Sequence, residues 1–135
     1  MKKILTLGML MLALLLTACG NSGPAAKMDF TMTDFAFSPG EFTIPAGREI
    51  TLHINHDGTV EHDFIIMKYG TDAGEMFDEA DQENVFWEMA LQPGDSKTVL
   101  FAAPDQPGAY QIICGMPGHL QSGMVGKLMV TEQQQ

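Results

Sequence analysis

The sequence predicts an all-β sandwich, because short alternating segments recur between frequent turn signals. In residues 49–55 (EITLHIN), Ile50, Leu52 and Ile54 share one face and polar residues share the other, as in a half-buried strand. Pro-Gly and Asp-Gly turns recur between such segments. Several short strands with regular turns between them are typical of a sandwich.

The other strands are expected in order along the chain. From Met28 to Thr33 apolar and polar side chains alternate, and Phe35 and Phe37 follow before the turn SPG at 38–40. Residues 41–44 form a short strand closed by PAG. His62 begins the next strand soon after the turn NHDG at 55–58. The remaining strands are expected at 62–67, 85–91, 96–102, 109–114 and 125–131.

One segment, from Gly70 to Leu91, interrupts the pattern. It is acidic and has no clear alternation before residue 85. The spacing of its apolar residues is compatible with a helix around 75–83. The sequence therefore predicts a short acidic insert with helical character inside the sandwich.

The N-terminus predicts export. Lys2 and Lys3 precede an apolar run at 4–16, which is too short to span a bilayer but fits a signal segment. Residues 16–19 (LTAC) resemble the lipobox of bacterial lipoproteins, which implies cleavage before Cys19, lipidation of its sulfur and extracytoplasmic attachment to a cell-envelope membrane. The alternative is an ordinary signal peptide. The expected organisation is a signal peptide at 1–18, a lipidated cysteine and tether at 19–27, one domain at 28–131 and a polar tail at 132–135.

The net charge excludes some partners. Without the two lysines of the signal, five basic side chains face 17 acidic ones, a formal balance of −12. Such a chain does not bind nucleic acid or an anionic membrane surface through its own charge. Eight acidic residues between Asp72 and Asp95 either steer a basic partner, such as a c-type cytochrome, or form a solvated loop.

A possible metal site is visible near the C-terminus. Cys114, His119 and Met124 lie within the eleven residues CGMPGHLQSGM, and lipidation of Cys19 would leave Cys114 without a disulfide partner. Thiolate, imidazole and thioether form a soft ligand set that favours copper over calcium, magnesium or manganese. A type 1 electron-transfer site needs a second histidine. The candidates are His53, His56 and His62.

Two segments carry a family resemblance. Residues 55–64 (NHDGTVEHDF) and 110–130 (YQIICGMPGHLQSGMVGKLMV) resemble the two ligand segments of the cupredoxins, blue copper proteins that include plastocyanin, azurin, auracyanin and rusticyanin. The resemblance covers about residues 28–131 and implies a Greek-key β-sandwich. The C-x₄-H-x₄-M spacing is most similar to that of rusticyanin and sulfocyanin, since plastocyanin has a shorter Cys-to-His gap and azurin a shorter His-to-Met gap.

The resemblance also implies the ligands. One type 1 copper is expected, with His62, Cys114 and His119 in its plane and Met124 as the axial ligand. Met116 is a competing axial candidate, but its position between Cys114 and His119 predicts that the loop turns it toward the surface. By contrast, His53 and His56 are expected to be solvated, because His53 falls on the outward face of its strand.

Asp63 departs from the family pattern. Plastocyanins and azurins usually carry Asn after the first histidine ligand, where it hydrogen-bonds toward the cysteine sulfur. Hydrogen bonds around the ligands tune a metal site. An ionised Asp63 that points inward would favour Cu(II) and lower the reduction potential, whereas a protonated or outward one would not.

The function implied by the resemblance is that of a membrane-tethered one-electron carrier that cycles between Cu(II) and Cu(I) and transforms no substrate. Electrons are expected to leave through His119, with Met116, Pro117 and Leu120 forming an apolar docking surface around it. The expected partners are redox proteins, either a c-type cytochrome or a respiratory or photosynthetic membrane complex.

Two alternatives remain. Multicopper oxidases and copper nitrite reductases share the fold, but place His beside the type 1 Cys; Ile113 and Gly115 flank Cys114 here, which disfavours an enzyme. A copper-storage or delivery protein is favoured by eight methionines after the signal, together with His53 and His56. Such a protein would bind Cu(I) and show no intense colour.

Overall fold

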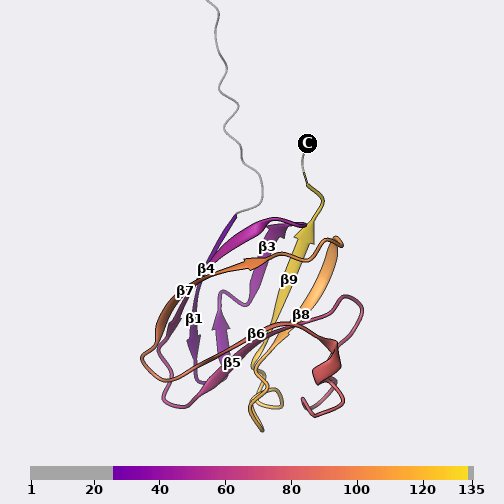
Figure 1. Ribbon diagram of the computed structural model, residues 1–135. Helices are drawn as coiled ribbons and strands as arrows, with labels where there is room; N and C mark the ends of the chain where they lie inside the picture. Colours follow the sequence, from indigo (N-terminus) through magenta and orange to yellow (C-terminus); the bar gives the residue numbers. More distant parts are fainter. Residues whose placement is uncertain (1–25, 134–135) are drawn as a thin grey trace, which may run out of the picture.

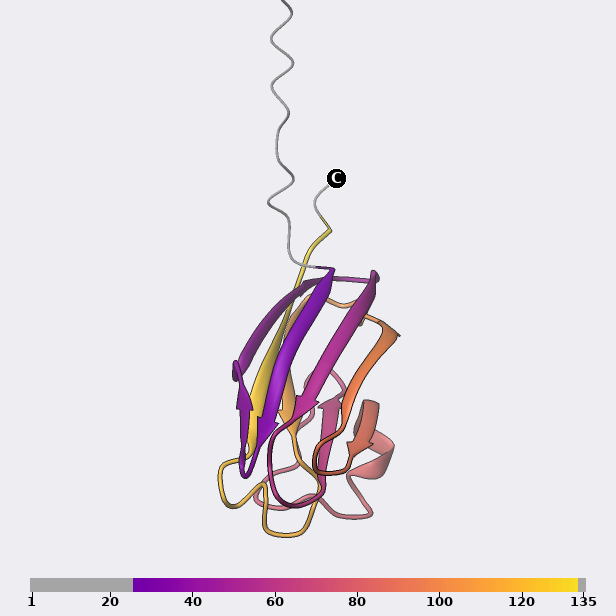
Figure 2. The same ribbon diagram turned by 90° about the vertical axis from the view of Figure 1, so that its left-hand side faces the viewer.

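The alternating apolar residues assemble two sheets, which form the two layers of a sandwich (Figures 1 and 2). The computed structural model describes residues 26–133. Within this range the sheets have the strand orders β2-β1-β4-β7 and β3-β9-β8-β5-β6. The strands are β1 (Lys27–Thr33), β2 (Ala36–Ser38), β3 (Glu41–Pro45), β4 (Glu49–His56), β5 (His62–Met67), β6 (Val85–Leu91), β7 (Ser96–Ala102), β8 (Gly108–Ile113) and β9 (Val125–Thr131). The all-β sandwich predicted from the sequence is thereby confirmed.

The core lies between the two layers. Ile50, Leu52 and Ile54 of β4 are fully buried, as their alternation predicts. Phe30 of the first sheet packs on Phe64 of the second, with 4.5 Å between ring centroids. Burying such side chains stabilises the sandwich by about 1.5–3 kcal/mol each. The core therefore holds together strands that are far apart in the sequence.

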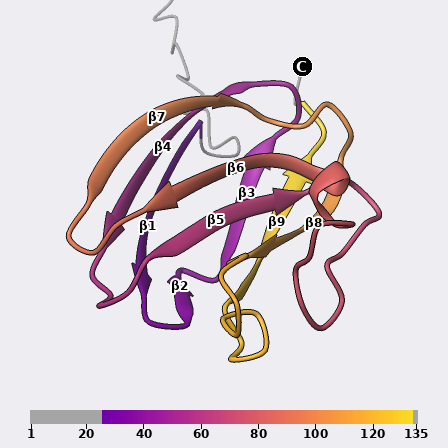
Figure 3. The same ribbon diagram turned by 60° about the horizontal axis from the view of Figure 1, so that its bottom comes forward.

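Non-sequential pairing brings three connections to one end of the sandwich. The parallel pairing of β1 and β4 places Met32 beside His56, and the Asp57 amide donates to the Met32 carbonyl oxygen at 2.8 Å. The β1–β2 turn thus lies beside the β4–β5 loop, and the long β8–β9 loop closes the same end (Figure 3). The start of β1 and the end of β9 lie at the opposite end (Figure 1).

The acidic insert contains less helix than predicted. Around residues 75–83 the chain forms successive turns, and the one helical piece within the described residues is the 3₁₀ helix η1 (Gln82–Asn84). Side chains compete with the helical backbone here: Asp78 accepts from the Ala80 amide at 2.8 Å, and Asp81 accepts from the Asp78 amide at 3.0 Å. Strand β6 then occupies the predicted range.

Among residues 26–133 there is no helix long and apolar enough to cross a membrane.

Candidate metal centre

Three predicted ligands converge at the end of the sandwich. His62 is the first residue of β5, Cys114 follows β8 directly, and His119 lies in the β8–β9 loop. Their ligand atoms all lie within 4.8 Å of one another. Cys114 Sγ is 3.3 Å from His119 Nδ1 and 3.8 Å from His62 Nδ1, and the two Nδ1 atoms are 3.0 Å apart. One sulfur and two imidazole nitrogens therefore face a common point.

The β8–β9 loop turns back on itself through backbone hydrogen bonds. The Met124 amide donates to the His119 carbonyl at 3.0 Å, and the Cys114 amide donates to the Met124 carbonyl at 3.2 Å. Gly118 and Gly123 have φ of 85° and 91°, left-handed values that favour glycine. Met124 is fully buried in the same core cluster as Cys114. The loop thus brings all three of its candidate ligand residues to one end of the core.

Burial sets the electrostatics of the site. Cys114 and His62 are fully buried, whereas His119 is partly exposed. Burial raises the pKa of the Cys114 thiol, while hydrogen bonds from the backbone amides of Asp63 and Met116 oppose that rise. Burial also lowers the pKa of His62, which favours the neutral imidazole that a metal requires. A buried thiolate is stable only beside a cation, so this soft donor set fits a copper ion.

Asp34, which the sequence did not single out, contacts the far nitrogen of His62. Its Oδ1 accepts a hydrogen bond from His62 Nε2 at 3.2 Å. The Thr59 amide donates to the same oxygen at 2.8 Å, and the Thr59 hydroxyl donates to Oδ2 at 2.7 Å. These hydrogen bonds, above all those from Thr59, lower the pKa of Asp34 to about 2. The carboxylate is therefore ionised at neutral pH. No local motif in the sequence indicates that Asp34 lies close to His62.

The prediction that His56 is solvated was wrong. Strand β4 continues to residue 56, so His56 shares the inward face of Ile54 and is 1% exposed. Its ring stacks on His62, with 4.9 Å between centroids and 22° between planes. His56 Nδ1 accepts from the Gly58 amide, whereas Nε2 has no hydrogen-bond partner among residues 26–133.

His53 lies on the outward face of β4, as predicted. Its Nδ1 is 2.9 Å from Thr98 Oγ1, and it is not part of the convergent ligand set. Four histidines thus separate into two convergent residues, one stacked neighbour and one surface residue.

Asp63 contacts the cysteine through its backbone. Its amide donates to Cys114 Sγ at 3.3 Å. Because adjacent residues of a strand face opposite sides, its side chain leaves the face on which His62 lies. Partial burial, followed by the charges of Glu61 and Glu88, raises the pKa of the Asp63 carboxyl.

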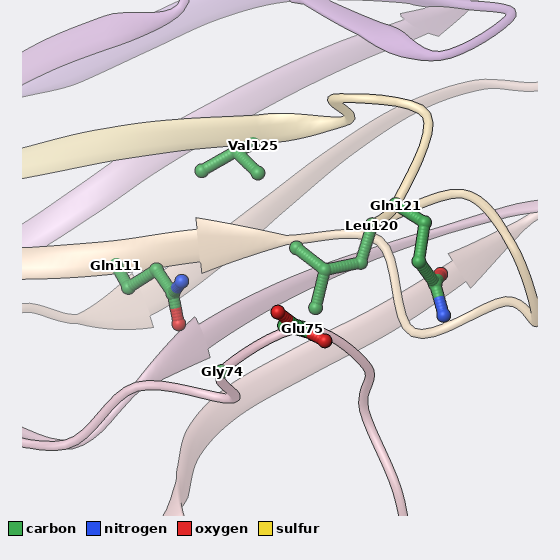
Figure 4. Close-up of a pocket in the computed structure, with 6 residues that line it drawn as sticks. All are labelled: Gly74, Glu75, Gln111, Leu120, Gln121 and Val125. Carbon is green, nitrogen blue, oxygen red and sulfur yellow. The ribbon is translucent and has the colours of Figure 1, made fainter.

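The expected docking surface also needs correction. Leu120 is only 8% exposed, because it belongs to a buried apolar cluster with Ile65 and Ile113. It also lines a pocket together with Glu75 of the insert (Figure 4). Met116 does not turn fully outward either, since it packs partly against the core. The insert covers Leu120, and sequence proximity to His119 did not reveal this.

Phe35 provides the apolar surface that Leu120 does not. It is 43% exposed, and its ring meets His119 edge to face with 5.1 Å between centroids. Its φ of 66° is unusual for a bulky residue and is worth noting at a candidate functional site. The apolar surface around His119 therefore consists of Phe35, Pro117 and the exposed part of Met116.

The fold and the convergent side chains define a β-sandwich with a candidate site for a soft metal ion at one end. Comparison with known proteins gives the family. The model of the cupredoxin-like domain matches residues 6–130. The chain belongs to the cupredoxin-like family.

Individual relatives agree with this assignment. The chain is 30% identical to Auracyanin-B of Chloroflexus aurantiacus over 112 residues, which cover 71% of this chain and 47% of that protein. It is 29% identical to the copper-resistant cuproprotein CopI of Rubrivivax gelatinosus over 126 residues, covering 84% of this chain and 74% of that protein. The chain thus spans about half the length of the first of these relatives.

A solved structure shares the architecture. The crystal structure of dithionite-reduced auracyanin from Roseiflexus castenholzii matches with a TM-score of 0.68 and 30% identity, covering 81% of this chain and 99% of that one. This agreement covers nearly the whole sandwich.

Proposed function

We propose that the protein is a one-electron carrier with a single type 1 copper. His62, Cys114, His119 and Met124 would hold the ion. The convergence of three ligand atoms within 4.8 Å, two of them on fully buried residues, carries this proposal. When bound, copper supplies the Cu(II)/Cu(I) couple.

The chain's own residues suit electron transfer. The proposed ligands come from two segments that pack into the core between the two sheets. The site is therefore expected to change little in geometry between oxidation states. His119 is the partly exposed ligand, and it is bordered by Phe35 and Pro117. We propose that electrons enter and leave through His119 across this small apolar surface, and that the acidic segment at 72–95 steers a basic redox partner such as a c-type cytochrome.

Attachment at Cys19 is part of the proposal, although that residue lies outside the described range. Strand β1 begins at the end of the sandwich opposite the metal centre (Figures 1 and 2). A lipid a few residues before β1 would therefore leave His119 facing away from the membrane. This orientation suits an extracytoplasmic protein that reacts with a membrane complex or a diffusible carrier.

An enzymatic role is disfavoured by the residues beside the cysteine. Ile113 and Gly115 flank Cys114, so no neighbouring imidazole connects it to a second copper centre. Residues 26–133 contain a single convergent cluster of this kind. An electron carrier needs no more than that one centre.

Copper storage or delivery is the second candidate, and the similarity to a copper-resistant cuproprotein supports it. A delivery protein would expose its soft ligands, whereas Cys114 and Met124 are both fully buried here. This burial favours the electron carrier over the delivery protein.

The absorption spectrum of the copper-loaded soluble domain tests the proposal. A thiolate bound to Cu(II) should produce an intense visible band that disappears on reduction and returns on reoxidation. A colourless protein that binds Cu(I) and releases it to a chelator would instead establish the delivery role.

A further inference from the structure

Asp34 and His62 form a contact that the family resemblance did not supply. Asp34 lies in the turn between β1 and β2, 28 positions before His62 in the sequence. His62 directs Nδ1 toward Cys114 and His119, and directs Nε2 toward the Asp34 carboxylate at 3.2 Å. A neutral imidazole has one N–H, and a carboxylate can only accept. The contact therefore places that hydrogen on Nε2 and leaves the Nδ1 lone pair free for a metal.

The carboxylate is itself held in place. Both of its oxygens accept hydrogen bonds from Thr59, one from the amide and one from the hydroxyl. Gly58 allows this close approach, because a Cβ at that position would lie 2.5 Å from Asp34 Oδ1 and 3.1 Å from its backbone nitrogen. The β4–β5 loop thus fixes Asp34 before any metal binds.

The ring of His62 is also confined on its faces. His56 stacks against it nearly in parallel, and Phe35 meets it edge to face with 6.5 Å between centroids. Stacking limits tilting of the ring, but two orientations related by a half-turn about Cβ–Cγ would make the same stacking contact. The Asp34 hydrogen bond is the contact that distinguishes the two flipped orientations.

We propose that Asp34 is a positioning residue for the copper ligand His62. It holds the Nε2–H tautomer and raises the electron density at Nδ1, as carboxylates behind metal-bound histidines do. Its fixed negative charge also stabilises Cu(II) more than Cu(I). The proposal rests on the proposed copper site, but its first test needs no metal.

Long-range ¹H–¹⁵N NMR of the metal-free protein reads the tautomer of His62 directly. The unsubstituted protein should show the Nε2–H form, and Asp34→Ala should show a mixture. Asp29→Asn is the matched control, since it removes one carboxylate from the preceding strand, where Asp29 pairs with exposed Lys27. A wild-type tautomer in Asp34→Ala would overturn the positioning role.

A second control distinguishes the contact of Asp34 with His62 from its contact with the hydroxyl of Thr59. Thr59→Val removes the hydroxyl bond to Asp34 Oδ2 but leaves the Oδ1 contact with His62. It should retain the Nε2–H tautomer. If Thr59→Val changed the tautomer as much as Asp34→Ala while a crystal structure of the variant kept the contact between Asp34 and His62 Nε2, the loop rather than Asp34 would set the tautomer and the proposal would be wrong.

Copper binding tests the effect of charge. Asp34→Ala should weaken Cu(II) binding about 10- to 100-fold, the usual effect of removing such a partner. Asp34→Asn keeps an oxygen acceptor without the charge, and should raise the reduction potential by about 59 mV for each tenfold preferential loss of Cu(II) affinity. If Asp34→Ala does not fold, Asp34→Asn decides: a potential equal to that of Asp29→Asn overturns the proposal. If no coloured copper form is obtained, the proposed function fails, while the tautomer result stands.

Discussion

The two halves of the metal centre differ in how the chain builds them. The C-terminal half is one continuous loop, in which backbone hydrogen bonds join Cys114 to Met124 and Met124 to His119. The other half is assembled around His62 from separate parts of the chain, with Asp34 from the β1–β2 turn and His56 from the end of β4.

This difference separates the residues expected to determine whether the metal site forms from those expected to tune its properties. The loop holds both candidate sulfur ligands, and its spacing makes it recognisable in the sequence. The half around His62 adds one ligand, and the contacts that orient it come through sheet pairing. Loss of the thiolate that the loop holds should therefore remove the site, whereas changes around His62 should alter its stability, affinity or potential.

The largest effect is expected in the loop. Cys114→Ser replaces the thiolate by a hydroxyl that stays protonated at neutral pH, so the intense visible band should be lost completely. Absorption and EPR spectra of the copper-loaded protein measure this. Ser122→Ala is the control in the same loop: it removes the hydroxyl that donates to the Gly118 carbonyl and keeps the backbone amide bonds, so it should keep the colour. Retention of the band in Cys114→Ser would refute the ligand assignment.

Two glycine substitutions compare the stability of the halves. In Gly58→Ala the new Cβ would lie 2.5 Å from Asp34 Oδ1, 3.0 Å from His56 Cε1 and 3.1 Å from the backbone nitrogen of Asp34. Such overpacking should destabilise the metal-free protein by about 1–3 kcal/mol. In Gly115→Ala the nearest atom is the side-chain end of Ile65 at 2.7 Å, which can move, so a smaller loss is expected.

Denaturant unfolding of the metal-free protein measures both variants. Gly40→Ala is the matched control, because its Cβ would lie 3.7 Å from the nearest atom, an ordinary contact. A Gly58→Ala variant as stable as Gly40→Ala would show that the loop accommodates the change, and would remove the contrast between the halves.

The axial position gives a smaller effect. Met124→Leu conserves volume, so its stability cost should stay below about 1.5 kcal/mol. Loss of the thioether should shift the reduction potential while the visible band remains, because the axial ligand tunes the potential of such a site but does not supply the thiolate. Voltammetry on Met124→Leu and Met116→Leu distinguishes the two methionines. A shift in Met116→Leu alone would make Met116 the axial ligand.

The smallest effect concerns pH and the support of His56. Asp95 accepts from the Gln92 amide at 3.0 Å, and its backbone carbonyl accepts from the His56 amide. The Gln92 hydrogen bond, helped by Lys97, lowers the pKa of Asp95 below its ordinary 3.8. Its stabilising contribution is therefore present above pH 3.8 and is lost as the pH falls through the lowered pKa.

Asp95→Asn should flatten this part of the acid unfolding profile, with little change at neutral pH beyond the altered hydrogen bond. Unfolding of the metal-free protein between pH 2 and 5 (about the range that a lowered aspartate pKa affects) measures it. An unchanged profile would show that Asp95 makes no such contribution.

Local pattern determined much of this protein in advance. Period-2 alternation predicted the strands, including β6, β7 and β9 with their bounds, because a residue's inward or outward direction repeats along a strand. The short spacing of Cys114, His119 and Met124 predicted that their loop folds back on itself, because glycines permit the tight turns that this requires. His62 was identified by family resemblance rather than by pattern.

Only the tertiary structure decided the surroundings of these residues. The parallel pairing of β1 with β4 brings Asp34 to His62 and buries His56. Packing of the insert buries Leu120, whereas Phe35 of the β1–β2 turn is the exposed neighbour of His119. Such contacts depend on strands distant in the sequence. Alternation reports which way a side chain faces, but not which other segment it meets there.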